Sequence, residues 1–578
     1  MIRIESSTLG NQIGIIARGD RRLRKIKREG GLCRPSNRPL FLINMDERPA
    51  GAIALPLESL FMNSPDMPSR PTCDVAHSAL LADLYQFTML QAYQAAGMNG
   101  EASFELFCRR LPPRRGFVMA AGLEPVLDWL ESLRFQPHEI DWLAGTGRFR
   151  PEMLAVLRGW RFTGEVSAVP EGTIVFPGEP MMRITAPLGQ AQLVESRILN
   201  LIHAHSLVAT KAARCVIAAG GASLIEFGLR RAHGAEAAMI ASRSSVLAGF
   251  EATANVLAGM RDGLPLAGTM AHSFVLAHEA EALAFEHYGQ ANPGHVAFLI
   301  DTYDTEQGAH RAVAAAHELA RHGIALQAVR IDSGDLARQS HRVRRILDAA
   351  GLTQVKILVS GDLDEWRVAA LRTVRAPIDA FCVGTALSTS SDAPSLDMAY
   401  KLVEYAGRPC SKRSPGKATL PGRKQVWRRY DAKGLIAADL IALTDEPAPT
   451  LSASACALTG GSRSVAGAAA PLPGMAWQAL LWPVMRDGRR LRPAPSIEAI
   501  RQHAAAQLSA LPPALRSLGA VNPVPVSLSP ALRQVAPDAK LNLMAGDPGG
   551  QRSRPSRPPP APGDRRSPAR PRPAAQTR

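Results

Sequence analysis

Short apolar runs alternate with longer amphipathic stretches from about residue 222 onward. The apolar runs occupy 223–227, 296–300, 326–331, 357–360 and 378–383. Between them, apolar residues recur at helical spacing over 236–257, 306–321, 336–350 and 363–374. Continuous apolar strands that alternate with helices are typical of a parallel sheet covered by helices. The number of these units favours a βα barrel over an open sheet.

The segments on either side of this region mix helical and strand patterns. Helical spacing covers 79–90, 123–133 and 192–207, and Gly97 is the expected stop after the first of these. Strand patterns cover 102–108, 162–166, 172–176 and 181–184. Order resumes at 477–490 and in a helix over 496–508, for which Ser496 is the expected N-cap.

Composition separates three segments from this ordered pattern. Residues 1–75 are predicted to be disordered or an over-long start, 446–474 a low-complexity insertion, and 541–578 a disordered Arg/Pro-rich tail. Of the formal charge of +16, residues 1–70 supply +5 and residues 546–578 supply +6. Because the ends hold most of the charge, it does not indicate a nucleic-acid substrate for the core. A basic arm at 21–28 that contacts nucleic acid is the alternative interpretation.

The sequence gives no support for a membrane protein, a zinc site or a disulfide framework. We find no run of about 18 uncharged apolar residues, so no membrane span is predicted. The N-terminus lacks the layout of a secretion signal, which predicts a cytoplasmic protein. The seven cysteines form no CxxC pair, so we expect buried free thiols rather than a zinc site or a disulfide framework.

Residues capable of chemistry follow several of the predicted strands. In parallel βα folds the active site lies at the carboxyl ends of the strands. The turns at those ends hold Gly228-Leu229-Arg230-Arg231, Asp301-Thr302-Tyr303-Asp304, Asp332-Ser333-Gly334-Asp335, Ser360-Gly361-Asp362 and Gly384-Thr385. We therefore predict a single catalytic rim built from these turns.

The residue types on this rim suit a phosphorylated sugar and a small anion. Backbone N–H groups at Gly384 and the Thr385 hydroxyl suit a phosphate. The acids Asp332 and Asp335 suit ribose hydroxyls or a Mg²⁺ ion. The arginines of the rim suit carboxylate or diphosphate groups; they are Arg230, Arg231 and Arg330.

Each of these residues also has a purely structural alternative. Asp301 or Asp332 could cap the following helix, and Arg330 could belong to a structural ion pair. His272, in a Gly/Thr-rich turn at 268–273, could be a structural histidine. Neither a GxxxxGK[ST] loop nor a GxGxxG turn after a strand occurs. If ATP is used, direct transfer to a side chain is therefore expected, with His272 as the acceptor.

Several motifs together resemble the nicotinate phosphoribosyltransferase family, over about 79–445 and 477–535. They are Leu81-Ala82-Asp83-Leu84-Tyr85-Gln86, Glu226-Phe227-Gly228-Leu229-Arg230-Arg231, Gly268-Thr269-Met270-Ala271-His272-Ser273, Asp301-Thr302-Tyr303-Asp304-Thr305, Arg330-Ile331-Asp332-Ser333-Gly334-Asp335-Leu336, Gly384-Thr385 and Leu420-Pro421-Gly422-Arg423-Lys424-Gln425. The resemblance implies an irregular α/β barrel at 216–400. It also implies a second α+β domain built from both ends of the core, at 76–215 and 401–540.

The resemblance further implies an activity and a set of site residues. Nicotinate and 5-phosphoribosyl 1-diphosphate would give nicotinate mononucleotide and diphosphate with Mg²⁺, and ATP hydrolysis would be coupled through phosphorylation of His272. Nicotinate would be held by Tyr85, Thr269 and Arg330, and the ribose phosphate by Thr385. The protein would be a homodimer in the salvage route to NAD, with Tyr85 reaching the neighbouring subunit's site.

On chemical grounds, Asp332 and Asp335 would stabilise the ribose cation, and Asp301 and Asp332 are candidate Mg²⁺ ligands. Nicotinamide or quinolinate in place of nicotinate remains an alternative, because the sequence ranks these substrates without excluding any. A non-catalytic nucleic-acid-binding protein that works through its basic ends is the alternative from a different functional class.

Overall fold

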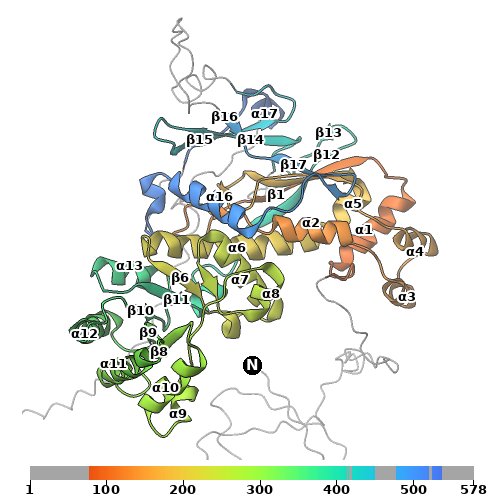
Figure 1. Ribbon diagram of the computed structural model, residues 1–578. Helices are drawn as coiled ribbons and strands as arrows, with labels where there is room; N and C mark the ends of the chain where they lie inside the picture. The colour runs from red at the N-terminus through yellow and green to blue at the C-terminus, as the bar shows by residue number, and fades with distance from the viewer. Residues whose placement is uncertain (1–76, 413, 415–418, 450–476, 520–523, 537–578) are drawn as a thin grey trace, which may run out of the picture. The chain divides into compact units, whose positions relative to one another are not determined.

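The computed structural model describes residues 77–412, 414, 419–449, 477–519 and 524–536. The predicted tail at 541–578, nearly all of 446–474 and all of 1–75 lie outside these ranges. The contacts within the chain group residues 74–578 into one compact unit. Its described part is mixed α/β structure in which two large sheets share one long helix (Figure 1).

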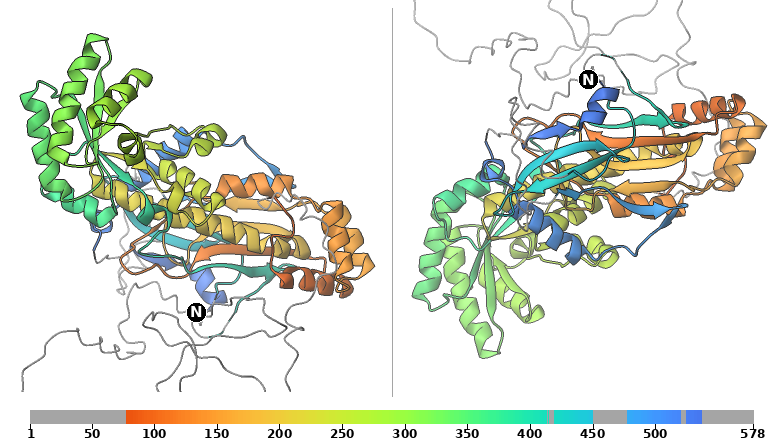
Figure 2. Two further views of the ribbon diagram at one scale, coloured as in Figure 1. Left: turned by 90° about the horizontal axis from the view of Figure 1, so that it is seen from below. Right: turned by 90° about the horizontal axis from the view of Figure 1, so that it is seen from above.

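The first large sheet is parallel and lies in the middle of the sequence. Its strands, in spatial order, are β7 (Ala252–Thr253), β6 (Ser223–Glu226), β11 (Ala380–Val383), β10 (Lys356–Val359), β9 (Leu326–Ile331) and β8 (Val296–Leu299). All of the pairings between them are parallel. Strands β7 and β8 form the two edges, so the curled sheet is a half-barrel (Figure 2). The predicted parallel βα region is therefore confirmed, although in the described residues it is an open sheet.

Helices cover the outer face of the half-barrel. They include α7 (Ala235–Ala248), α10 (Glu281–Ala291), α11 (Thr305–Arg321), α12 (Leu336–Ala349) and α13 (Glu365–Thr373), and the shorter α8 (Val256–Asp262), α9 (His272–Leu276) and α14 (Thr385–Ser388) connect them to the strands. Acidic N-caps begin the helices that follow β8, β9 and β10. Asp304, Asp335 and Asp364 each accept a hydrogen bond from a backbone N–H of the first turn.

The second large sheet is antiparallel and takes strands from both ends of the ordered chain. In spatial order it contains β13 (Arg408–Pro409), β12 (Met398–Tyr405), β1 (Glu101–Cys108), β5 (Pro180–Pro187), β3 (Glu165–Ala168), β17 (Trp482–Arg486) and β18 (Arg489–Arg490). The smaller sheets contain β16 (Trp477–Ala479), β14 (Lys424–Tyr430), β15 (Ile436–Leu443) and β19 (Val526–Leu528), and β2 (Val118–Met119) with β4 (Ile174–Val175). The helices of this part are α1 (Leu84–Ala95), α2 (Leu123–Ser132), α3 (Pro137–Gly145), α4 (Pro151–Arg158), α5 (Leu188–Leu193), α16 (Ile497–Ser509) and α17 (Pro530–Val535).

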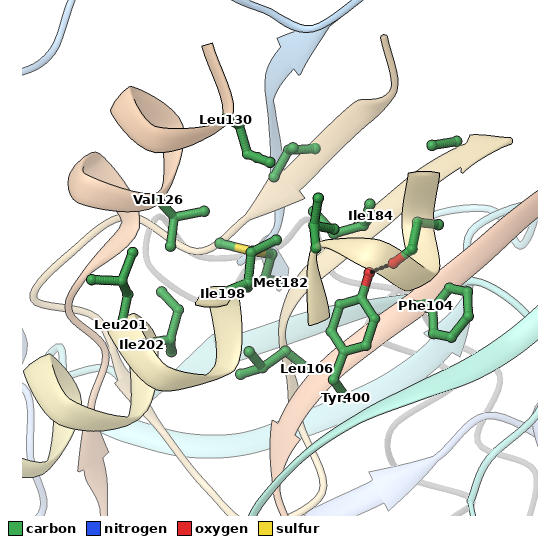
Figure 3. Close-up of a cluster of buried hydrophobic side chains, with 14 of the residues drawn as sticks. Phe104, Leu106, Val126, Leu130, Met182, Ile184, Ile198, Leu201, Ile202 and Tyr400 are labelled. Carbon is green, nitrogen blue, oxygen red and sulfur yellow. Dashed lines mark hydrogen bonds between the residues drawn. The ribbon is translucent and has the colours of Figure 1, made fainter. Parts of the chain in front are cut away.

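Helix α6 (Glu195–Ala219) joins the two hydrophobic cores. Its first half packs Ile198, Leu201 and Ile202 into the core of the antiparallel sheet (Figure 3). In the same core the Tyr400 hydroxyl donates to the Ala191 carbonyl oxygen at 2.6 Å. The second half of α6 packs small residues, including Ala209 and Ala212, into the core of the half-barrel. The chain therefore holds both sheets on one continuous helix.

Several expected boundaries were wrong. The helix expected over 236–257 ends at Ala248, before Gly249, and is followed by β7 and α8. The expected helix over 192–207 instead divides at Val194 into α5 and the longer α6. Helix α1 begins at Leu84 rather than at residue 79, and α3 and α4 were not predicted. Several of these limits carry local signals: Gly249 ends α7 with a φ of 124°, and Pro137 and Pro151 are the first residues of α3 and α4.

Two other expectations have an outcome in the described residues. Ser496 caps α16 by accepting from the Ala499 N–H at 3.2 Å, as predicted. Cys108, Cys215 and Cys382 are buried free thiols. None of the helices described by the structure is long and apolar enough to cross a membrane.

Candidate active site

Turns from three neighbouring strands of the half-barrel interlock at their carboxyl ends. The Asp301 carboxylate, directly after β8, accepts from the Asp332 N–H at 2.8 Å and from the Ser333 hydroxyl at 2.7 Å, both directly after β9. The Ser360 hydroxyl, directly after β10, donates to the Asp332 carboxylate. Three of the five predicted turns therefore meet in one hydrogen-bonded group.

His272 stands on this rim as the first residue of α9. Its Nδ1 lies 3.1 Å from the Thr302 hydroxyl, and its Nε2 lies 3.7 Å from the nearer Asp332 carboxylate oxygen. The two side chains are partly exposed, His272 by 38% and Asp332 by 32%. A substrate could therefore reach the imidazole and the carboxylate together.

Arg330 lies inside the curve of the sheet, on β9, and is 8% exposed. Its guanidinium donates to the Thr269 hydroxyl at 2.5 Å and to the Met270 carbonyl oxygen at 3.5 Å. The group also lies over the Phe227 ring, 5.7 Å from the ring centre. Its Nε atom is buried and has no hydrogen-bond partner. A buried donor without a partner is costly, so this atom is suited to a ligand's acceptor group.

A cavity of about 1000 Å³ lies against the inner face of the half-barrel. Phe227 and Thr269, which both contact Arg330, line it at the carboxyl ends of the strands, and Leu326 and Lys356 line it at the amino ends. Small side chains of the strands leave this space open; they are Ala297, Ala328 and Ala380. A barrel packed with large residues would fill the same volume.

The phosphate-binding turn predicted at Gly384 follows β11. A Cβ atom on residue 384 would lie 2.9 Å from the Phe227 carbonyl oxygen, so only glycine lets the two strand ends approach this closely. Thr385 is exposed at the start of α14. Arg230 and Arg231 are exposed in a single 3₁₀ turn, Leu229–Arg231, after β6. All four residues therefore follow β6 or β11, which pair with each other.

Two predicted site residues have other contacts. Asp335 is exposed, and its carboxylate accepts from the Arg338 N–H at 3.0 Å as the N-cap of α12. The sequence left open that Asp301 or Asp332 caps the helix that follows it. That alternative was wrong, because Asp304 caps α11 and Asp335 caps α12. Tyr85 lies on α1, where its hydroxyl donates to the Glu195 carboxylate at 3.4 Å.

The two predicted metal ligands are suited to Mg²⁺ by their donor chemistry. One oxygen of Asp301 accepts the two hydrogen bonds of the rim, while the other, Oδ1, is buried without a hydrogen-bond partner. The second candidate, Asp332, is partly exposed beside it. Mg²⁺ is commonly held by one or two carboxylates together with waters and substrate phosphates. Across the described residues, no cluster of three or more metal-ligating side chains occurs, so these two residues would hold the ion only with such additional ligands.

Three side chains that shape this site were given no role from the sequence: Thr302, Ser360 and Phe227. Phe227 and Ser360 end predicted strands and Thr302 lies two residues after one, so position was the available signal. Only the contacts show that they meet Arg330, Asp332 and His272, respectively. The Cys382 thiol is also close to the rim on β11. Burial raises its pKa to about 12, so it stays protonated and is a poor nucleophile.

Comparison with known proteins gives a consistent result over most of the chain. Residues 80–203 match the nicotinate phosphoribosyltransferase N-terminal domain, and residues 423–536 match the nicotinate phosphoribosyltransferase C-terminal domain. A nicotinate phosphoribosyltransferase of Mycobacterium tuberculosis is 46% identical over 453 residues, which cover 78% of this chain and 91% of the relative. That of Bos taurus is 33% identical over 536 residues, which cover 82% and 97%.

Solved structures agree with these sequence matches. The crystal structure of human nicotinic acid phosphoribosyltransferase superposes with a TM-score of 0.69 at 31% identity, and covers 80% of this chain and 100% of the human one. The resemblance that the motifs indicated is thereby confirmed. The chain belongs to the nicotinate phosphoribosyltransferase family.

Proposed function

We propose that this protein is a nicotinate phosphoribosyltransferase, which forms nicotinate mononucleotide and diphosphate from nicotinate and 5-phosphoribosyl 1-diphosphate in NAD salvage. The observation that carries the proposal is Arg330. It is a buried cation on the inner face of the half-barrel, beside a large cavity, with one donor unpaired. A planar guanidinium binds a carboxylate through two parallel hydrogen bonds, which matches the acid group of nicotinate.

The neighbours of Arg330 support an aromatic acid as its partner. Phe227 lies under the guanidinium and also lines the cavity, so a pyridine ring can pack in the same apolar wall. Thr269 already accepts from Arg330 and keeps the group pointing into the curve of the sheet. Nicotinamide has no negative charge to offset the burial of this cation, which favours nicotinate among the candidate substrates.

The reaction joins the pyridine nitrogen to the anomeric carbon of the ribose. The bond from that carbon to the diphosphate oxygen breaks, and diphosphate leaves with the electron pair. Positive charge develops on the ribose as this bond breaks, and the carboxylates of Asp332 and Asp335 would stabilise it. The partial exposure of Asp332 beside His272 supports this role. Arg230 and Arg231 would hold the diphosphate, while Gly384 and Thr385 would hold the ribose 5-phosphate. When bound by Asp301 and Asp332, Mg²⁺ would neutralise part of the diphosphate charge.

ATP coupling through His272 is the second part of the proposal. The imidazole is partly exposed and lies 3.7 Å from Asp332, so a phosphoryl group on it would stand beside the diphosphate site. Its added negative charge would alter how tightly the diphosphate substrate and product are held. The expected result is that ATP raises the rate of the native enzyme and has no effect on His272→Ala.

The test of this function compares nicotinate, nicotinamide and quinolinate as substrates of the full chain, with and without ATP. Nicotinate mononucleotide formed from nicotinate is the expected product. Product from nicotinamide alone would assign Arg330 another role. Equal stimulation by ATP in the native enzyme and His272→Ala would contradict only the coupling. A chain without residues 1–75 and 546–578 should stay active, whereas the nucleic-acid reading requires those ends.

A homodimer with a shared site accounts for the position of Tyr85. This side chain is 46% exposed on α1, beside Leu84 at 53%, and contacts Glu195 rather than the rim of its own chain. Apolar residues on α8 are also exposed: Val256, which lines the cavity, by 71% and Met260 by 78%. A second copy of the chain would cover both surfaces.

Complementation tests the shared site directly. Tyr85→Ala and Arg330→Met should each be weakly active alone, because each damages every site of a homodimer. When the two variants are unfolded and refolded together, half of the dimers are mixed and each of these has one site with both native residues, so activity should recover toward about a quarter of the native value. Recovery no greater than the sum of the separate variants would contradict a site shared between subunits.

A further inference from the structure

A buried carboxylate lies directly behind the proposed substrate turns. Glu226, the last residue of β6, is fully buried, and no lysine or arginine pairs with it among the described residues. It accepts hydrogen bonds from the Gly228 N–H, from the Thr253 hydroxyl at 2.5 Å and from the Ser242 hydroxyl at 3.1 Å. Burial raises its pKa, and the three donors oppose that shift. Such a group is expensive to bury, so its contacts are informative.

One oxygen of Glu226 fixes the arginine turn, which we define as residues 228–231. This oxygen accepts from the Gly228 N–H. The carbonyl oxygen of Gly228 in turn accepts from the Arg231 N–H at 2.9 Å and begins the 3₁₀ turn. Gly228 therefore connects the carboxylate, through its N–H, to the backbone of Arg231, through its carbonyl oxygen.

The other oxygen fixes the loop that leads to Thr269. It accepts from the Thr253 hydroxyl, and the Thr253 backbone is bonded to that loop on both sides. The Thr253 N–H donates to the Pro265 carbonyl oxygen at 3.0 Å, and the Ala267 N–H donates to the Thr253 carbonyl oxygen at 3.0 Å. Thr253 and Thr269 both line the cavity, and Thr269 accepts from Arg330.

A third contact ties Glu226 to the scaffold without touching either turn. Ser242 lies in the middle of α7, fully buried, and donates to the same oxygen as Thr253. Asn255, the N-cap of α8, donates to the Ser242 hydroxyl at 3.1 Å through its side chain and to the Thr253 hydroxyl at 3.0 Å through its backbone. The Thr253 hydroxyl also lies 3.2 Å from the Ser242 hydroxyl. Ser242 therefore offers a control within the same buried network: it has no direct hydrogen bond to residues 228–231 or to the loop that leads to Thr269, and reaches them only through Glu226 and Thr253.

We propose that Glu226 is a positioning residue that sets the separation between the arginine turn and the loop bearing Thr269, and so between the diphosphate and the pyridine acid. This role rests on the proposed function, because those two turns would hold the two substrates. The carboxylate bridges them through one backbone donor and one hydroxyl donor. Loss of either bridge lets one turn shift, and a shift of about 1 Å can cost about 100-fold in rate.

The test measures KM for each substrate, kcat and the melting temperature in three variants of the full chain. Glu226→Gln keeps the shape but turns an amide N–H₂ toward groups that donate, and it should raise KM for both substrates, with kcat/KM lower by about 10- to 100-fold. Thr253→Val removes the second bridge together with the hydroxyl's contacts to Asn255 and Ser242, leaves the first bridge intact, and should raise KM for nicotinate more than for the phosphoribosyl substrate. Ser242→Ala should lower the melting temperature while both KM values stay within about threefold of native.

A rescue variant and the pattern of KM values distinguish a positioning role of Glu226 from a role in stability alone. Thr253→Ser retains the hydroxyl, so it should restore KM for nicotinate toward the native value, even if Glu226→Gln does not fold. Native KM values in both Glu226→Gln and Thr253→Val would overturn the positioning role, as would equal KM changes in Ser242→Ala. A native chain that forms no nicotinate mononucleotide would overturn the proposed function itself, and this role with it.

Discussion

Replacing Arg330 should damage recognition of the pyridine acid while leaving the sugar substrate largely unaffected. The guanidinium is 8% exposed, has one unpaired donor and lies over Phe227. A hydrogen bond to a charged partner contributes about 1.5–3 kcal/mol. Arg330→Lys keeps the charge but loses one arm of the fork, and each 1.4 kcal/mol is tenfold in binding. KM for nicotinate should therefore rise roughly 10- to 150-fold, by the same conversion.

Steady-state kinetics with each substrate varied in turn would measure this effect. KM for 5-phosphoribosyl 1-diphosphate should change by less than about threefold, because Arg330 contacts Thr269 and Phe227 rather than the phosphate turns. Arg345→Lys, at an exposed position on α12, is the matched control and should behave as native. If KM for nicotinate were unchanged in Arg330→Lys, the carboxylate would bind elsewhere and the reasoning would be refuted.

Three further changes test separate parts of the structure. Asp332→Asn should lower kcat by about 100-fold with smaller changes in KM, because it removes the charge that faces the developing ribose cation; steady-state rates would show this, and a native kcat would contradict it. Burial, assisted by Arg243, lowers the pKa of His205 to about 3, so its protonation favours the unfolded chain. The free energy of unfolding should then fall by about 1.4 kcal/mol for each pH unit below about 6.5, until the pH nears that folded-state pKa; urea unfolding at several pH values would detect this slope, and His205→Gln should reduce it. Arg428→Met would leave Asp439 buried without its partner, which bonds to it at 2.6 Å, and should cost about 3–5 kcal/mol in urea unfolding; a loss below 1 kcal/mol, the value typical of an exposed ion pair, would contradict it.

Five of the six parallel strands of the half-barrel were predictable because their signal is local, whereas the two-residue β7 was not. Each of the five is a continuous apolar run, and β9 was predicted at its observed limits, Leu326–Ile331. The helix expected over 236–257 failed because apolar spacing continues past Gly249, and only the contacts of β7 with β6 show that the chain has changed direction. The sequence also could not predict that the sheet is open rather than closed into a barrel, because this depends on which strands stay unpaired at its edges.

For the candidate site, sequence position indicated which turns lie at the carboxyl ends of the strands, but not which contacts each acid makes there. Asp301, Asp332 and Asp335 look alike as acids after strands. In the structure Asp335 caps a helix, Asp301 braces the next turn, and Asp332 faces His272. The Thr302 contact and the unpaired Nε of Arg330 depend on side-chain geometry, which spacing does not encode.

The most direct measurement of the central claim is the specificity of the purified protein for its pyridine substrate. With 5-phosphoribosyl 1-diphosphate and Mg²⁺ present, kcat/KM is measured for nicotinate and for nicotinamide by mass detection of the mononucleotide. The account predicts nicotinate mononucleotide and a preference for nicotinate that collapses in Arg330→Met. A preference for nicotinamide, or one for nicotinate that survives in Arg330→Met, would contradict it.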